Sequence, residues 1–199
     1  MGRPREHSDE TRTALLDAAE ELVDADGPDA VSVRAIADIV GTTTRAVYSL
    51  FGSKDALIAS LAERAFELLA TGIEQLPQTD DPEQDLVEAA VLVFRAMVLE
   101  HPSLFRLAFL RREGDPPRAA TFASAQRGFT MLADRVARLE ANGAGLGGRT
   151  VRAATCQFDA LCEGLAVVEL RAPQFFSEDP ERIWREAVAA LVTGFKNEP

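Results

Sequence analysis

The residues from Val31 to Leu57, VSVRAIADIVGTTTRAVYSLFGSKDAL, constrain the fold more than any other part of the chain. Apolar residues at Val33, Ile36 and Val40 follow helical spacing, so they give one short helix an apolar face. Gly41 is expected to end that helix, because glycine adopts a positive φ without steric cost. The segment therefore begins with a short amphipathic helix and a tight turn.

Three threonines follow this glycine, and a threonine hydroxyl can accept a hydrogen bond from the free N–H groups that begin a helix. The second helix carries Val47, Leu50 and Phe51 towards the core, while Arg45 and Tyr48 face outwards. Two short helices joined by a glycine turn are typical of a helix-turn-helix motif. In that motif the second helix enters the major groove of DNA.

This segment contains a set of residues in a specific order: Ile36-Ala37, Val40-Gly41, Val47-Tyr48, Phe51, Lys54 and Leu57. Upstream of them, the first helix carries Thr11-Arg12, Leu15, Ala18-Ala19 and Leu22, and Gly27 ends it. With these residues, about 8–60 resembles the DNA-binding domain of the TetR family of bacterial transcriptional regulators. The resemblance implies that DNA is contacted by Arg34, Thr42, Thr43, Thr44, Arg45, Tyr48, Ser49 and Lys54.

These residues are expected to divide between two kinds of DNA contact. Thr44, Arg45 and Ser49 are predicted to face base edges, and arginine is the side chain best suited to guanine. By the resemblance, Tyr48 and Lys54 match positions that contact phosphates and so set the register of the protein on DNA. The alternative is that Tyr48 packs its ring and Arg45 is a solvated surface charge.

The net charge of −11 by itself favours an acidic globular protein rather than a DNA-binding one. Between Val31 and Lys54, however, the sequence has three positively charged residues and one negatively charged residue. Binding to DNA depends on the local charge that meets phosphate. We therefore expect weak non-specific DNA binding and a modest dependence on salt.

The rest of the sequence also predicts helices, so the expected fold is all-α. They are expected at about 8–25, 54–75, 82–100, 102–112, 118–141, 149–171 and 180–196. The break from Pro77 to Pro82 separates two parts. The predicted division is a DNA-binding domain over 1–53, a connecting helix over 54–76, and a ligand-binding and dimerisation domain over 77–199.

The C-terminal part is rich in phenylalanine, which predicts either an ordinary helical core or an apolar cavity for a small hydrophobic effector. The candidate wall consists of Phe94, Met97, Phe105, Phe109, Phe122, Phe129 and Phe158. Relatives in the family commonly bind an inducer there.

The last two predicted helices carry apolar residues at helical spacing. Relatives pair these helices across a two-fold axis, so we predict a homodimer interface, with packing inside one chain as the alternative. The predicted interface residues are Leu161, Leu165, Val168, Trp184, Val188, Leu191, Val192 and Phe195.

Several classes of protein are not expected from this sequence. The sequence contains no run of about eighteen apolar residues, so no membrane span is expected. The N-terminus is polar and shows no secretory signal, so a cytoplasmic protein is expected. We find no catalytic motif that predicts an enzyme, and no spacing of histidines and cysteines that predicts a metal site or cofactor. The glycine-rich loop 142–148 follows a helix, so it predicts a flexible connection rather than a phosphate site.

Together with the resemblance to the TetR family, these patterns predict a homodimeric transcriptional repressor. The resemblance implies that it binds a palindromic operator in double-stranded DNA and is released by a small apolar ligand. Two alternatives stay open at this point. One is a helical carrier or sensor of small molecules without a DNA role. The other is a protein-interaction module that uses the helix-turn-helix face.

Overall fold

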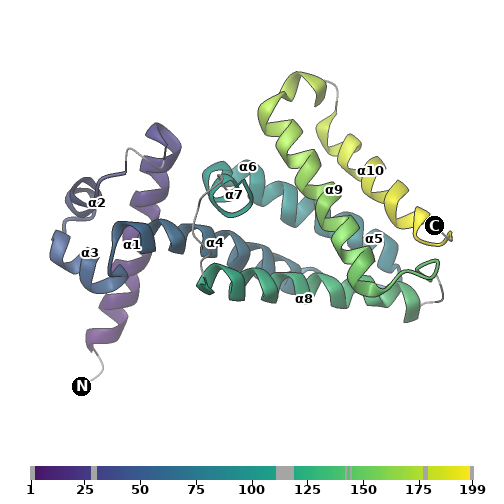
Figure 1. The fold of residues 1–199 in the computed structure, drawn as a ribbon, viewed down its shortest axis with the longest axis horizontal. Helices are drawn as coiled ribbons and strands as arrows, with labels where there is room; N and C mark the ends of the chain where they lie inside the picture. The colour runs from purple at the N-terminus through teal and green to yellow at the C-terminus, as the bar shows by residue number, and fades with distance from the viewer. Residues whose placement is uncertain are drawn as a thin grey trace. The chain divides into compact units, whose positions relative to one another are not determined.

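The computed structural model describes residues 3–27, 31–110, 119–141, 143, 145–176 and 179–197, with the side chains of 3–8 and 119–122 left out. Every regular element in these ranges is a helix and none is a strand, which confirms the predicted all-α class (Figure 1). The N-terminal helices are α1 (Arg3–Asp26), α2 (Val33–Val40), α3 (Thr44–Phe51) and α4 (Lys54–Gln75). The later ones are α5 (Pro82–Glu88), η2 (Ala89–Arg95), α6 (Ala96–Glu100), α7 (Pro102–Phe109), α8 (Ala119–Ala141), α9 (Val151–Arg171), η3 (Pro173–Phe176) and α10 (Pro180–Gly194).

The chain forms two compact units. One combines residues 1–65 with 102–122, and the other combines 66–101 with 123–199. In the first unit α7 packs against α1, although the sequence places α7 beyond the expected boundary at residue 77. Helix α4 contributes its first part to one unit and its last part to the other. The division at 1–53, 54–76 and 77–199 stays a prediction.

Side-chain caps begin several helices at the positions that the sequence indicates. The Thr43 hydroxyl accepts from Ala46 N at 3.2 Å and starts α3. The Ser53 hydroxyl accepts from Ala56 N at 3.0 Å before α4, which confirms the predicted start of that helix. Asp81 Oδ1 accepts from Gln84 N at 3.0 Å and starts α5. Each cap satisfies one of the backbone donors that a helix leaves free at its start.

The predicted helix over 82–100 is interrupted by the π-helical segment η2. This segment lies close to α4, because a Cβ placed on Gly72 would come within 2.6 Å of Val93 Cγ1. It ends at Arg95, whose guanidinium pairs with Glu169 on α9. π-helical turns inside α-helices are rare and often carry function. No residue pattern in 82–100 signals the change, so the sequence alone predicts one continuous helix there.

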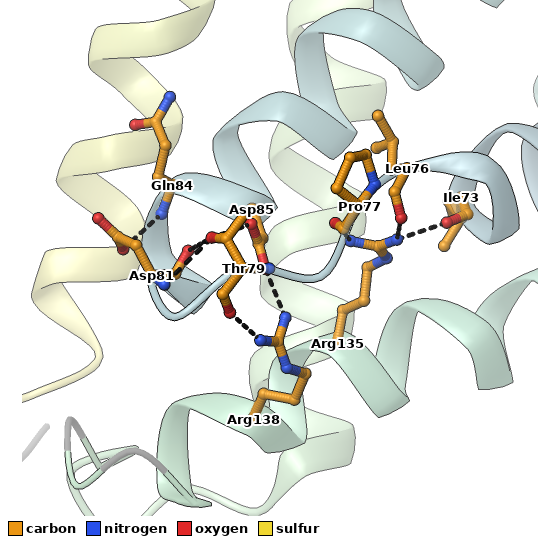
Figure 2. A network of polar contacts seen from close by, with 9 residues as sticks. All are labelled: Ile73, Leu76, Pro77, Thr79, Asp81, Gln84, Asp85, Arg135 and Arg138. Atoms are coloured by element: carbon orange, nitrogen blue, oxygen red, sulfur yellow. Dashed lines mark hydrogen bonds and ion pairs between the residues drawn. The ribbon is translucent and has the colours of Figure 1, made fainter.

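Two arginines of α8 hold the end of α4 and the loop that follows it (Figure 2). Arg135 is only 3% exposed, and its Nη2 donates to the carbonyls of Ile73 and Leu76, both at 2.6 Å. Its Nη1 donates to the carbonyl of Pro77 at 3.1 Å. These carbonyls are acceptors that the C-terminus of α4 would otherwise leave unpaired. The last turn of α4 is therefore fixed to α8.

The second of these two arginines of α8, Arg138, donates to the Asp85 carboxylate and to the Thr79 carbonyl. Asp85 also accepts from Thr79 N at 2.9 Å and from Thr79 Oγ1 at 2.7 Å. Burial alone would raise the pKa of Asp85, but the hydrogen bonds from Arg138 and Thr79 outweigh it and hold that pKa below its usual value. The network thus joins α8 to α5 through a charged carboxylate.

Among the described residues, no helix is long and apolar enough to cross a membrane.

Candidate DNA-binding interface and the surfaces of the C-terminal unit

The turn between α2 and α3 has the geometry that the sequence predicts. Gly41 ends α2 with φ 72°, in the left-handed region that favours glycine. Thr42 N donates back to the Ala37 carbonyl at 2.9 Å, which closes the end of α2. The Thr43 cap then starts α3 two residues after the glycine. The turn is short, so α2 and α3 are held in a fixed relation by local hydrogen bonds.

Apolar side chains fix the inner face of this motif against α1. Val33 and Ile36 of α2 are buried, as are Val47 and Phe51 of α3. α2 packs against both α1 and α3 (Figure 1). Because the inner face of α3 is occupied in this way, its opposite face points outwards.

The outward face of α3 carries four of the predicted DNA-binding residues, and all four are exposed: Thr44, Arg45, Tyr48 and Ser49. Tyr48 is 51% exposed, so its hydroxyl is accessible to a partner, which disfavours the alternative that its ring only packs. Hydroxyl, phenol and guanidinium groups on one exposed helix face can donate hydrogen bonds to phosphates and to base edges. The face therefore has the chemistry of a DNA-reading surface.

The other four predicted residues lie around this helix in different settings. Thr43 is exposed, but its hydroxyl oxygen already accepts from the backbone of α3, so its first role is a cap. Arg34 on α2 is exposed and lies 4.0 Å from Asp38, both side chains being mostly solvated. Such a surface pair is weak, which leaves the Arg34 guanidinium available to a phosphate. Thr42 and Lys54 are half-buried.

Comparisons with known proteins agree with this geometry. Residues 15–61 match the family model described as "Bacterial regulatory proteins, tetR family", and residues 87–191 match "Tetracyclin repressor-like, C-terminal domain". The chain belongs to the TetR family. It is therefore a DNA-binding transcriptional regulator with a helix-turn-helix domain and a C-terminal domain of the ligand-responsive kind, and its family consists of regulators rather than enzymes. A comparison with curated proteins found no match.

Solved structures share the fold of this TetR-family chain along nearly its whole length. A Rhodococcus protein of unknown function has a TM-score of 0.81 at 18% identity, covering 94% of this chain and 96% of its own. FadR from Bacillus subtilis, solved with stearoyl-CoA, has a TM-score of 0.76 at 16% identity, covering 92% and 98%. NalD, a secondary repressor of an efflux pump in Pseudomonas aeruginosa, has a TM-score of 0.66 at 24% identity, covering 95% and 97%.

The residues predicted to line an effector cavity in this TetR-family chain are divided between the two compact units. Phe94, Met97 and Phe158 are buried in the second unit, where Phe129 is half-buried. Phe105 lies in the first unit and stacks on Phe109, with ring centroids 5.1 Å apart. The side chain of Phe122 lies outside the described residues. The cavity stays a prediction.

The second unit also holds charged groups on the same helices as some predicted cavity residues, Arg95 beside Phe94 and Asp159 beside Phe158. The Arg95 guanidinium is already bound by Glu169, so Arg95 serves the core. Asp159 and Glu163 lie one turn apart on α9 and are half-buried. Burial raises the pKa of both, and with the nearby charge of Asp159 it raises the pKa of Glu163 to about 7. Within the described residues, neither carboxyl is paired with a cation.

Four of the predicted dimer residues, on α10 or directly after it, are buried inside the chain itself. Trp184 and Val188 are 0% exposed, and Val192 and Phe195 are 1% exposed. Trp184 packs against Phe94, with ring centroids 6.2 Å apart. α10 lies against α5, η2 and α9, so these apolar side chains fill the core of the second unit. The prediction must be corrected here, since a buried side chain cannot also face a partner.

The remaining predicted dimer residues are more accessible, and small residues accompany them. Leu161, Leu165 and Leu191 are half-buried, and Val168 is 40% exposed. The outward face of α9 also carries Ala153, Gln157, Ala160 and Gly164, and that of α10 carries Ala187, Ala190 and Gly194. A Cβ added at Gly164 or Gly194 would meet nothing within 4 Å. The helical spacing of large apolar side chains does not single out these small residues.

Proposed function

We propose that this chain represses transcription by binding a palindromic operator as a homodimer and that a small apolar effector releases it. The observation that carries the DNA part is the exposed face of α3, with Thr44, Arg45, Tyr48 and Ser49 above a fully packed inner face. Arg45 reads guanine by paired hydrogen bonds, and Thr44 and Ser49 add contacts to base edges. Tyr48, Arg34 and Lys54 contact phosphates. We assign no catalytic role to the chain.

The proposed dimer interface uses the outward faces of α9 and α10. Ala160, Gly164, Ala190 and Gly194 present little side-chain volume there, so the helices of two chains can approach closely. Val168 and the half-buried leucines supply apolar area at its edge. A two-fold pair presents two recognition helices to two half-sites, which is why the operator is expected to be palindromic.

Release follows from linkage between the two binding events. An effector that binds better to a conformation with weaker DNA affinity must lower DNA affinity by the same factor. Helix α4 is continuous from one unit into the other, and Arg135 anchors its last turn. We propose that effector binding shifts α4 and thereby moves two recognition helices away from the spacing of roughly 34–36 Å that successive major grooves require. Equal spacing in effector-bound and operator-bound dimers would contradict this mechanism.

The effector is proposed to be small and mainly apolar. Phe94, Met97, Phe129 and Phe158 supply apolar surface in the second unit, and Asp159 supplies a carboxyl that lacks a cation there. The similarity to FadR, which is solved with stearoyl-CoA, supports a ligand with an apolar part, since the stearoyl group is a long hydrocarbon chain. A panel of apolar compounds, scored by the loss of operator binding, tests this part.

The DNA part is tested by fluorescence anisotropy with the DNA that flanks the chain's own gene, across a salt series and with random DNA as the competitor. We expect saturable binding to one palindromic segment. The variant Arg45→Ala should weaken that binding by about ten- to a hundredfold and relax the preference at one base pair, as for loss of a paired guanine contact. The matched control Arg127→Ala removes an exposed arginine of α8 and should change nothing.

The alternative function, a small-molecule carrier without a DNA role, predicts a different result. Such a protein would show no preference for any duplex at any salt concentration, and Arg45→Ala would be silent. A protein-interaction module that uses the same face would bind its partner with little dependence on salt, whereas DNA binding weakens as salt rises.

A further inference from the structure

Arg12 on α1 makes three contacts that bring three helices of the first unit together. Its Nη1 donates to the Leu50 carbonyl of α3 at 3.3 Å, and its Nη2 donates to Ser60 Oγ of α4 at 3.1 Å. Its guanidinium also lies over the ring of Phe51, 4.5 Å from the centroid. One side chain therefore touches the recognition helix twice and the connecting helix once.

The contact to Leu50 matters because of where it lies in α3. The last carbonyls of a helix have no partner inside the helix and carry the negative end of its dipole. α3 has only eight residues, and Gly52 N pairs with the Tyr48 carbonyl at 2.8 Å. Arg12 adds a positively charged donor to the Leu50 carbonyl, another acceptor in the last turn of α3. The start of α3 is held by Thr43, so Arg12 supplies the matching hold at the other end.

The aromatic contact adds a constraint on rotation. Phe51 is buried at 8% exposure, and a guanidinium over its ring face is favourable only while the ring keeps its orientation. If α3 rotated about its axis, the Leu50 carbonyl and the Phe51 ring would move away from Arg12 together. The outward face of α3 would then change the direction in which it presents Arg45.

The contact to Ser60 extends this hold to α4. Ser60 Oγ donates to the Ala56 carbonyl at 3.1 Å, so its oxygen is fixed on the helix surface when it accepts from Arg12. Arg64 offers a useful comparison, because it also joins α4 to α1, through Asp17 at 2.6 Å and Glu20 at 3.5 Å. Within the part of the chain that the structure describes, these contacts of Arg64 join α4 to α1 only, whereas Arg12 also makes two contacts with α3.

We propose that Arg12 is a positioning residue for DNA recognition: it sets the orientation of α3 relative to α1 and α4 without itself binding DNA. Its guanidinium is engaged by a carbonyl, a hydroxyl and a ring on the inner side of the motif. This role goes beyond the assigned DNA contacts, all of which lie on α2, on α3, in the turn between them or at the start of α4.

The test compares Arg12→Gln with the matched control Arg64→Gln, using a duplex that the unaltered protein selects from a random-sequence pool. We expect Arg12→Gln to weaken binding to that duplex by at least roughly tenfold, the effect of losing a hydrogen bond to a charged group. Arg64→Gln should weaken it by less than about threefold, since the ion pairs of Arg64 join α4 to α1 and do not involve the recognition helix. Binding to random DNA should stay within about twofold of the unaltered protein for Arg12→Gln, because phosphate contacts dominate non-specific binding.

The salt dependence separates positioning from direct contact. If Arg12 bound a phosphate, Arg12→Gln would lower the slope of log affinity against log salt by roughly one and weaken binding to all sequences equally. That result would overturn the proposal, as would equal losses for the two variants. An unchanged slope with a selective loss on the chosen duplex supports it. The conservative variant Arg12→Lys should restore only part of the affinity, because one ammonium cannot reach both acceptors and the ring.

A second measurement does not need DNA. Hydrogen exchange of the free protein reports the opening of individual helices. Arg12→Gln should speed exchange of the amides at 47–52 while those of α2 exchange as before, and Arg64→Gln should leave both unchanged. Unaltered exchange over 47–52 in Arg12→Gln would overturn the proposal even if the DNA function itself proved wrong.

Discussion

The buried contact of Glu169 with Arg95 and Trp184 gives the sharpest test of the packing of the second unit. Arg95 Nη2 donates to Glu169 Oε1 at 2.8 Å, and its Nε lies 3.1 and 3.2 Å from the two carboxylate oxygens. Trp184 Nε1 donates to Oε2 at 2.7 Å. The side chains of Glu169 and Arg95 are 8% and 16% exposed, so water screens the pair weakly. The contact joins η2, α9 and α10.

The variant Glu169→Gln keeps the shape of the side chain but removes its charge. Breaking a buried ion pair by removing one partner costs about 3–5 kcal/mol, because the other charge stays buried without compensation. Arg95 keeps some access to water, and the amide oxygen still accepts one of the hydrogen bonds. We therefore expect a loss of about 2–3 kcal/mol in the free energy of unfolding. For a chain of this length that loss lowers Tm by roughly 4–12 °C.

The assay is urea unfolding at one protein concentration, followed by the fluorescence of Trp184, the single tryptophan, and by circular dichroism. The matched control is Glu186→Gln, which breaks the exposed pair of Arg182 and Glu186 and should cost less than about 0.5 kcal/mol. A Glu169→Gln protein within about 0.5 kcal/mol of the unaltered one would refute the reasoning, since a buried charge cannot lose its partner without cost.

Three further predictions follow from single positions. The raised pKa of Glu163, about 7, lets the folded state keep a proton that the unfolded state releases, so stability should fall as pH rises from about 4.5 to 7. In urea unfolding, Glu163→Gln should lack this fall, and its free energy of unfolding at pH 8 should be about 1–3 kcal/mol higher than that of the unaltered protein. Gly147→Ala should lower Tm by several degrees in calorimetry, because Gly147 has φ +55° and an added Cβ would lie 2.0 Å from the Asn197 carbonyl oxygen. The control Gly148→Ala has a similar backbone strain but its Cβ meets nothing within 4 Å, so it separates the steric effect from that strain. Ala160→Glu should convert a dimer to a monomer in light scattering with the fold kept, whereas an unchanged dimer would contradict the proposed interface.

The helix-turn-helix motif could be predicted because its determinants are neighbours in the chain. Thr43 caps α3 by accepting from the N–H of Ala46, three residues away, and Gly41 needs only its own backbone freedom. The spacing of Val47 and Phe51 defines one face of α3. Such local rules depend little on the rest of the protein. The same holds for the starts of α4 and α5 at Ser53 and Asp81.

The sequence by itself thus determined the helical class, the caps and the exposed face of α3, since these depend on interactions within a few residues. Only the tertiary structure decided which apolar face of α10 is covered: spacing marks Trp184 and Val192 as apolar but does not say whether their own chain or a partner buries them. It also decided the partners of Arg12 and Arg135, which lie 38 to 62 residues away. Such pairings arise when the core closes, and no local pattern encodes them.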